Sequence, residues 1–167
     1  MVKLIVAISS NRAIGKDNDL IWHLPADMKF FSETTKGSIV LMGRRNWESI
    51  PAKYRPLPNR HNLVVTRDTT FNAAGCEVFH DVESAIEHYA NDTRELYVIG
   101  GGQIYQYCLD NDLIQEMLIT HIHAEFEADT FFPEIHEDQW AIETIQTFKK
   151  DDKNPYDFTI KKYTKTS

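Results

Sequence analysis

Short apolar runs alternate with amphipathic segments along most of this chain, and the alternation predicts its fold class. Buried strands are expected at 2–8, 38–42, 62–66, 77–79, 96–99 and 117–122. Helices are expected from Pro25 to near Gly37, within 43–50, over 82–89 with Asp81 as N-cap, and over 103–109. Strands that alternate with helices in this way are typical of a largely parallel sheet with crossover connections.

The C-terminal part changes this pattern. Residues 140–148 and 156–163 have the pattern of two longer strands that close the sheet as an antiparallel pair. The chain shows no repeat, low-complexity run or interdomain linker, and its 167 residues, 42% hydrophobic and 26% charged, are ordinary for one globular domain. We therefore predict a single α/β domain.

Composition argues against several functions. No membrane span is present and the apolar run 1–8 is too short and too weakly basic for a signal peptide, so we expect a cytoplasmic protein. Cys76 and Cys108 lie far apart, which predicts free thiols. The seven histidines lack paired ligand spacing, so no metal site is expected and His121 is interpreted as structural. A formal charge of −7 argues against a nucleic-acid partner.

One acidic residue, Asp27, lies among large apolar ones. Pro25 is expected at the first helical position, which places Asp27 in the first turn and on the same face as Phe31. If Met28, Phe31 and Trp22 bury that face, desolvation raises the pKa of the carboxyl and suits it to handling a proton. The alternative, which this segment taken alone favours, is that the acid complements the helix dipole.

Two predicted strand ends carry features that suit an anionic cofactor. Gly43-Arg44-Arg45 follows one strand and Gly100-Gly101-Gly102 follows another. Ligands of open α/β sheets bind at the carboxyl ends of strands, and glycines let a backbone approach a pyrophosphate closely. The triple glycine is not G-x-G-x-x-G, and a tight strand-to-helix turn explains it equally well.

Two arginines strengthen the cofactor hypothesis. Arg44 and Arg67 both follow strands, so their guanidinium groups can converge on one phosphate such as the 2′-phosphate of NADPH. The alternative is that each is a solvated loop arginine. The polar segment 9–20, rich in turn formers, has the character of a lid over such a site.

A series of short motifs runs along essentially the whole chain. They are Ala7, Ile14-Gly15, Trp22-x-Leu24-Pro25-x-Asp27, Met42-Gly43-Arg44, Trp47-Glu48-Ser49-Ile50, Pro56-Leu57-Pro58-x-Arg60-x-Asn62, Ile99-Gly100-Gly101-Gly102-x-Ile104-Tyr105 and Asp129-Thr130-x-Phe132-Pro133. In these motifs, and in their order and spacing, the chain resembles bacterial dihydrofolate reductase, and their joint occurrence is highly specific.

The resemblance implies an eight-stranded sheet with four flanking helices, an adenosine-binding subdomain at roughly 38–93, and a monomer. It also implies reduction of 7,8-dihydrofolate to tetrahydrofolate with NADPH, and binding of antifolate inhibitors such as trimethoprim. By motif position, Asp27 would bind the pterin and support protonation of N5, Trp22 would hold a water, and Tyr105 would complete the catalytic set. Thr120 would reach the pterin through another water, and Arg60 would pair with the glutamate carboxylate of the substrate.

The same resemblance assigns the rest of the site. The folate pocket would be lined by Ile5, Ala7, Met28, Phe31, Ile50, Leu57 and Ile99. The cofactor would be held by Ala7, Ile14, Gly15, Asn18, Gly43, Arg44, Arg45, Asn46, Val65, Thr66, Arg67, Ile99, Gly101, Gly102, Gln103, Ile104, Tyr105 and Thr130.

The chain departs from the common bacterial pattern at several positions. Residues 51–54 lengthen one loop, Gln103 replaces a frequent arginine and Ala128 a frequent glycine. Pro155 stands where some relatives have a serine that latches the lid away from the nicotinamide pocket. Proline offers neither a hydroxyl nor an N–H, so we expect a weaker latch and a lid that stays closed in product complexes. The alternative is that Pro155 merely stiffens a surface turn.

Two other functions remain open from sequence. A related pyrimidine or pterin reductase, such as that of riboflavin synthesis, would share the fold but is not expected to carry Asp27 and Arg60 together. A nucleotide-binding regulatory module would bind the cofactor without chemistry. Oxidation of NADPH in the presence of dihydrofolate distinguishes all three.

Overall fold

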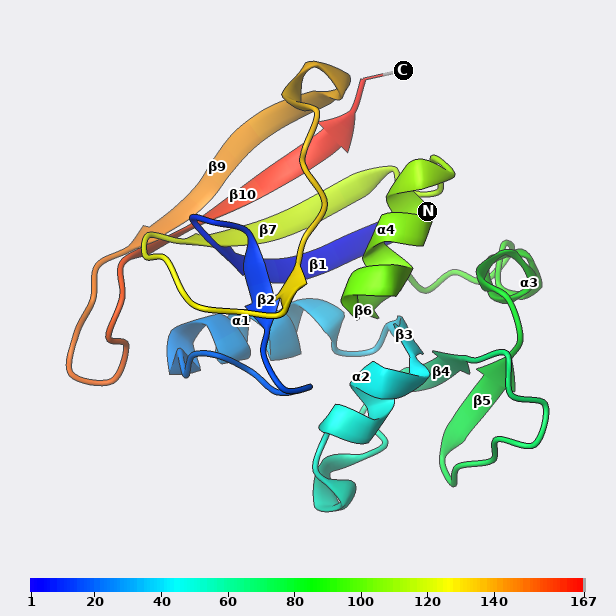
Figure 1. Ribbon diagram of the computed structural model, residues 1–167. Coiled ribbons are helices and arrows are strands. Elements are labelled where there is room, and N and C mark those ends of the chain that lie inside the picture. The colour runs from blue at the N-terminus through cyan, green and yellow to red at the C-terminus, as the bar shows by residue number, and fades with distance from the viewer. Residues whose placement is uncertain (167) are drawn as a thin grey trace.

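The computed structural model describes residues 1–166 as one α/β unit built on a mixed sheet. The eight strands lie in the order β5-β4-β3-β6-β1-β7-β10-β9 (Figure 1). Their bounds are β1 Val2–Ser9, β3 Ile39–Gly43, β4 His61–Val65, β5 Cys76–Phe79, β6 Leu96–Gly100, β7 Glu116–Ile122, β9 Trp140–Phe148 and β10 Phe158–Lys165. All pairings from β5 to β7 are parallel, and β10 pairs antiparallel with both β7 and β9. The predicted closing pair is confirmed.

Four helices connect the parallel strands. They are α1 Pro25–Thr35, α2 Arg44–Ser49, α3 Val82–His88 and α4 Gly102–Asp110, with short 3₁₀ turns η1 Ala52–Tyr54 and η2 Glu137–Gln139. Asp81 caps α3 as predicted, because its side chain accepts a hydrogen bond from the Ser84 amide. Within residues 1–166, no helix combines the length and apolar character that crossing a membrane requires.

A small second sheet was not expected from the sequence. It pairs β2 (Ala13–Gly15) with β8 (Thr130–Phe131), which are short and far apart in the chain. Neither segment is long enough to show a period of its own, so only their pairing reveals them. This sheet connects the polar segment 9–20 to the segment after β7.

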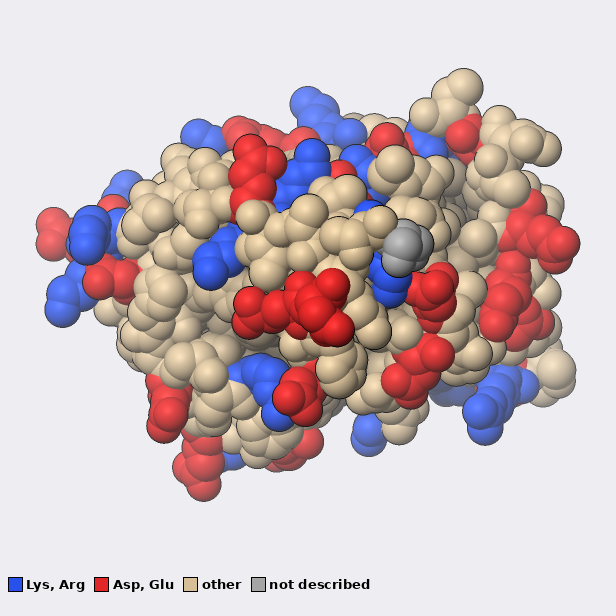
Figure 2. Space-filling view, turned by 90° about the horizontal axis from the view of Figure 1, so that it is seen from above, with Lys and Arg blue, Asp and Glu red and all other residues tan. Residues whose placement is uncertain are grey.

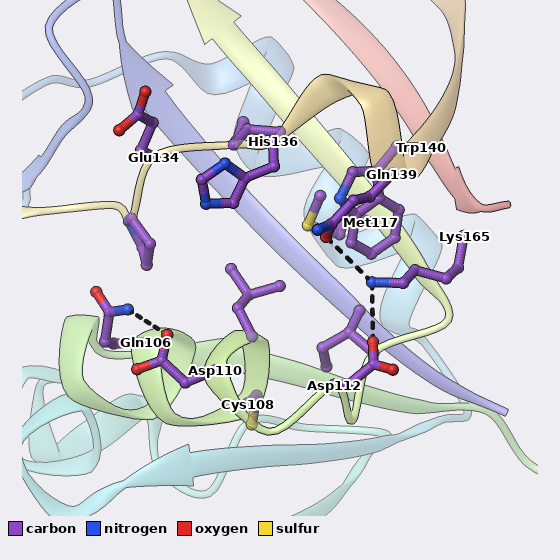
Figure 3. Close-up of a pocket in the computed structure, with 14 residues that line it drawn as sticks. Gln106, Cys108, Asp110, Asp112, Met117, Glu134, His136, Gln139, Trp140 and Lys165 are labelled. Carbon is purple, nitrogen blue, oxygen red and sulfur yellow. Dashed lines mark hydrogen bonds and ion pairs between the residues drawn. The ribbon is translucent and has the colours of Figure 1, made fainter. Parts of the chain in front are cut away.

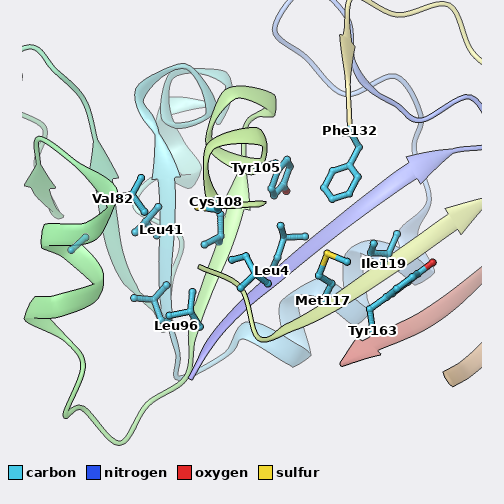
Figure 4. Packing of buried hydrophobic residues seen from close by; sticks show 14 of the residues in the cluster. Leu4, Leu41, Val82, Leu96, Tyr105, Cys108, Met117, Ile119, Phe132 and Tyr163 are labelled. Carbon is cyan, nitrogen blue, oxygen red and sulfur yellow. The ribbon is translucent and has the colours of Figure 1, made fainter. Parts of the chain in front are cut away.

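Apolar side chains pack on both faces of the central sheet. On one face α3 and α4 cover a cluster that includes Leu4, Leu41 and Met117 (Figure 4). On the other face α1 and α2 contribute Phe31 and Trp47 to a second cluster. Successive residues within a strand point alternately into one cluster and the other, as a sheet buried on both faces requires.

Substitution of Leu41, on the third strand of the sheet order, tests this packing. Leu41 is fully buried, so Leu41→Ala should lower the free energy of unfolding by about 2–5 kcal/mol through lost burial and an unfilled cavity. Ile145→Ala, at a β9 position that is 45% exposed, should cost under about 1 kcal/mol and serves as control. Urea unfolding measures both. Equal losses would show that Leu41 does not belong to the core.

Candidate active site

Asp27 lies in the first turn of α1 and faces the sheet. Its Oδ1 accepts a hydrogen bond of 2.6 Å from the hydroxyl of Thr120 on β7, a residue 93 positions away. Thr120 is 3% exposed and Asp27 is half-buried. The contact joins the helix to the sheet at the place where the sequence predicted a buried carboxyl.

Burial dominates the electrostatics of this carboxyl. Loss of hydration raises the pKa of Asp27 above its ordinary value, and the Thr120 hydroxyl lowers it by a smaller amount because it stabilises the charged form. A carboxyl with a raised pKa holds its proton closer to neutral pH than an exposed one. This property suits proton transfer and goes beyond what a helix-dipole partner requires.

Five of the predicted folate-pocket residues lie together. Ile5 from β1 belongs to the same apolar cluster as partly buried residues from four other segments, namely Phe31, Ile50, Leu57 and Ile99. Ala7 and Trp22 belong to the adjoining cluster around Leu24. Met28 is 49% exposed, so it buries Asp27 less than the sequence led us to expect.

Arg60 lies at the opposite end of α1 from Asp27. Its guanidinium donates to Thr35 Oγ1 at 2.7 Å, Pro58 O at 2.6 Å, and Ser32 O and Oγ at 2.9 Å each. It also lies 5.8 Å from the centre of the Phe31 ring. Burial lowers the pKa of Arg60 from its ordinary value. Eight helical residues from position 27 to 35 span about 12 Å, so an anionic group here is well separated from the Asp27 carboxyl.

The two glycine segments lie at neighbouring strand ends. β3 pairs with β6 so that Met42 is opposite Gly100, and α2 and α4 begin directly after these strands. A Cβ on Gly102 would approach Thr130 Cγ2 to 2.7 Å, and one on Gly43 would approach Ile104 Cγ1 to 2.9 Å. Only glycine allows these contacts, which bring two helix N-termini to one edge of the sheet.

Arg44 is already engaged within the protein. Its Nη1 donates to Asp68 Oδ2 at 2.8 Å, its Nε donates to Glu48 Oε2 at 3.3 Å, and its guanidinium stacks over Phe71. The bonds to Glu48 and Asp68 raise the pKa of Arg44. Arg67 follows the adjacent strand β4 and is exposed. The structure places both arginines at the same sheet edge and adds two carboxylates that the sequence did not indicate.

The lid is held by the segment after β7. Asp17 N donates to Asp129 Oδ2 at 2.8 Å, and β2 pairs with β8. This brings Ile14 Cδ1 to within 3.7 Å of a Cβ built on Gly102. Asn18 is exposed near the tip of the lid, where Lys16 and Asp19 form a β-bridge.

The other predicted cofactor residues follow the same sheet edge. Asn46 Nδ2 donates to Ile99 O at 3.4 Å, and the buried Tyr105 hydroxyl donates to Ile5 O at 2.9 Å. Gly15, Arg45, Val65, Thr66, Gly101, Gln103, Ile104 and Thr130 lie at or beside the ends of β2, β3, β4, β6 and β8 or the start of α4. Gln103 and Arg45 are exposed and Val65 is buried.

A separate cavity of about 310 Å³ lies between α4, β7 and the end of β10 (Figure 3). Met117 of β7 lines this cavity, whereas Thr120 of the same strand contacts Asp27. Residues three apart in a strand point to opposite faces of the sheet, so the cavity and Asp27 lie on opposite faces. Lys165 is paired there with Asp112 at 2.8 Å. The cavity is not part of the site around Asp27.

Comparison with known proteins identifies the family and the fold. The dihydrofolate reductase family model matches residues 1–165. The chain belongs to the dihydrofolate reductase family. It is 42% identical over 157 residues to dihydrofolate reductase of Staphylococcus haemolyticus, covering 94% of this chain and 91% of the relative. It is 41% identical over 168 residues to that of Bacillus subtilis, covering 99% and 95%.

A solved structure agrees with the fold of this dihydrofolate reductase. Dihydrofolate reductase from Enterococcus faecalis, complexed with NADP(H) and RAB-propyl, superposes with a TM-score of 0.87 at 35% identity, covering 100% of this chain and 97% of that one. The predicted α/β fold is thereby confirmed. The activity of this chain is the reduction of dihydrofolate.

Several residues of the site escaped sequence reasoning. Asp68 and Glu48 hold Arg44, Ser32 and Thr35 hold Arg60, and Asn154 contacts the start of α1. The Glu48 contact has helical i,i+4 spacing. The other contacts join residues that are distant in the chain, so no local sequence pattern signals them.

Removal of the Thr120 hydroxyl tests the electrostatics of Asp27. Thr120→Val keeps the side-chain shape but removes a bond to the charged carboxylate, so the pKa of Asp27 should rise further. The equilibrium should shift toward the protonated form by about tenfold. Titration of the Asp27 ¹³Cγ resonance measures it, with Thr147→Val on the exposed face of β9 as control. An unchanged midpoint would show that the hydrogen bond has no effect on the carboxyl.

Proposed function

We propose that Asp27 is the proton-handling residue of this dihydrofolate reductase. The single observation that supports it is a carboxyl buried against the sheet with its Oδ1 occupied by Thr120. Among residues 1–166, Oδ2 has no hydrogen-bond partner, so it is the oxygen available to a substrate. A pterin presents an amino group and an adjacent ring nitrogen as neighbouring N–H donors, and a carboxylate can accept a hydrogen bond from each.

The chemistry requires such a group. Hydride adds to C6 of dihydrofolate only when the adjacent N5 is protonated, because the C=N bond must become cationic to accept it. At Oδ2, Asp27 holds either a proton or a negative charge that stabilises a proton on N5, and it does so in a site that excludes bulk water. Trp22 lies beside this region, half-buried, and is proposed to hold the water that contacts the substrate.

The apolar cluster and Arg60 bind the remainder of the substrate. Ile5, Phe31, Ile50, Leu57 and Ile99 provide an apolar wall, and Arg60 supplies a cation at the distance of the glutamate tail. Four hydrogen bonds to protein oxygens already engage four of the five N–H groups of Arg60, which leaves one on Nη1. A bidentate bond to a carboxylate needs two N–H groups, and through Nη1 and Nη2 it therefore requires that a contact with Ser32 be released.

NADPH is the cofactor, and it supplies the hydride when bound. The residues present fit it: two glycine segments bring the starts of α2 and α4 to one sheet edge, and a Cβ on Gly101 would meet no atom within 4 Å, so backbone there is open to a ligand. We propose that these backbone N–H groups bind the pyrophosphate and that segment 38–93 binds the adenosine. Arg44 and Arg67 would bind the 2′-phosphate, and Ile14 and Thr130 would close over the nicotinamide.

We propose that the enzyme acts as a cytoplasmic monomer on free dihydrofolate, and that antifolate inhibitors occupy the same apolar wall. Figure 2 shows acidic and basic side chains interspersed on one face of the molecule, and the chain has a formal charge of −7. Neither feature suits a nucleic-acid or membrane partner.

Substitution of Asp27 tests the proposed role. Asp27→Asn removes acid assistance and keeps the side-chain shape, so turnover at pH 7 should fall by roughly 100-fold or more. It should recover in part at low pH, where solvent protonates the substrate. Asp110→Asn makes the same charge change on α4, across the sheet, and should leave kcat unchanged. Wild-type turnover by Asp27→Asn at pH 7 would refute the assignment.

Cofactor preference tests the two arginines. In the double variant Arg44→Gln and Arg67→Gln, the ratio of kcat/KM for NADPH to that for NADH should lose most of its value, since a charge-assisted contact contributes about 1.5–3 kcal/mol. Arg94→Gln, which breaks an exposed pair with Asp92, is the matched control. If the double variant retains the wild-type ratio, the 2′-phosphate binds elsewhere.

A further inference from the structure

The helix that carries Asp27 has no cap of its own. Leu24 is its N-cap residue and makes no side-chain hydrogen bond to the first turn. The nitrogen of Pro25 carries no hydrogen, so Ala26 presents the first free backbone N–H of α1. Asp27 is the next residue. Whatever binds the Ala26 N–H therefore fixes the backbone that carries the carboxyl.

Asn154, in the loop 149–157 between β9 and β10, provides the missing cap. Its Oδ1 accepts a hydrogen bond of 3.0 Å from Ala26 N, although the two residues are 128 positions apart. A side-chain oxygen on the second helical N–H is the contact that an N-cap residue ordinarily makes. Asn154 is only 8% exposed, so water does not readily replace it. Figure 1 shows this loop descending from the sheet on the side where α1 begins.

Asp151 holds the Asn154 side chain in this orientation. Asp151 Oδ1 accepts from Asn154 Nδ2 at 3.0 Å and from its backbone N at 2.8 Å, and Asp151 N donates to Asn154 O at 2.8 Å. Because the amide NH₂ is bonded inside the loop, the amide oxygen is the atom directed at α1. The cap is therefore pre-oriented by the loop.

Aromatic side chains give the same loop a second contact with the site. Tyr156 packs edge-on against Phe126, with ring centres 5.0 Å apart. Phe126 in turn packs against Trp22 at 5.2 Å. The loop thus contacts Ala26 directly through a hydrogen bond, and it reaches Trp22 indirectly, through the edge-on contact of Tyr156 with Phe126.

We infer that Asn154 is a positioning residue for the reaction, which acts through the Ala26 N–H to fix the place and the electrostatic surroundings of the Asp27 carboxyl. The inference rests on the proposed role of Asp27. The amide oxygen of Asn154 offsets the positive end of the helix at the residue next to that carboxyl. This explains why a surface loop buries an asparagine.

The charged groups near this contact are few. The pKa of Asp27 responds to burial and to Thr120, and no charged side chain contributes to its shift. In the loop itself Lys150, Asp151, Asp152 and Lys153 are exposed, and Asp157 accepts a bond from Lys150 N. A new charge at Asn154 would therefore add a charged side chain to an environment in which none now shifts the pKa of Asp27.

Two substitutions at Asn154 should shift Asp27 in opposite directions. Asn154→Ala removes the oxygen that offsets the helix end, so the protonated fraction of Asp27 above its midpoint should fall about threefold. Asn154→Asp replaces the amide that donates to Asp151 with a second carboxylate, and the negative charge that it adds beside the start of α1 should raise that fraction about threefold. The ¹³Cγ titration of Asp27 and the pH profile of single-turnover hydride transfer measure both. The profile midpoint should move to lower pH in the first variant and to higher pH in the second.

Asn111 offers a matched control, because its Nδ2 bonds Tyr107 O at the end of α4. Asn111→Ala and Asn111→Asp should leave the Asp27 midpoint in place. If both Asn154 variants lower thermal stability but keep the wild-type midpoints, Asn154 has only a structural role and the inference is wrong. The titration reports on the Asp27 carboxyl whether or not that residue is catalytic. Turnover of Asp27→Asn tests the catalytic role of Asp27, and the titration of the Asn154 variants tests the role of Asn154, so the two failures are distinguishable.

Discussion

A carboxylate loses hydration when it is buried, and a fold tolerates that loss only where hydrogen bonds or a proton replace the lost water. Asp27 is such a group, and the arrangement around it follows from this constraint. β7 presents the Thr120 hydroxyl to Oδ1, the central strands present apolar side chains, and the loop 149–157 fixes the start of α1. The result is a buried carboxyl with a raised pKa whose Oδ2 has no hydrogen-bond partner among residues 1–166.

The second half of the site depends on strand order. Because β3 and β6 are neighbours in a parallel pairing, the helices that follow them begin at the same sheet edge. The backbone N–H groups of two helix starts then face one region, and glycines let adjacent segments approach them closely. Ile5 of β1 lies between these two regions. Its carbonyl accepts a hydrogen bond from Tyr105, and its side chain belongs to the apolar cluster that contains Phe31.

The segment 9–20, which the sequence predicts to be a lid, is tied to a distant part of the chain. The lid is joined to β8 by the small sheet and by the Asp17 to Asp129 hydrogen bond. Pro155, expected to weaken a latch, is exposed, and its neighbour Asn154 makes the contact with α1 instead. Whether the lid stays closed in product complexes remains a prediction, because the contacts of Pro155 do not bear on it. Crystal structures with NADP⁺ and either folate or tetrahydrofolate test it.

The sequence determined the strands and helices because each has a local period or a local cap, and it placed Asp27 in a first helical turn because Pro25 precedes it. The motif positions also indicated the family and the residues that line the apolar wall. The partners of those residues were decided only by tertiary structure. Asn154 reaches Ala26 across 128 positions, Thr120 reaches Asp27 across 93, and Asp68 reaches Arg44 across 24. A hydrogen bond between such residues leaves no periodicity in either segment, since its geometry depends on how the sheet, the helix and the loop pack in space.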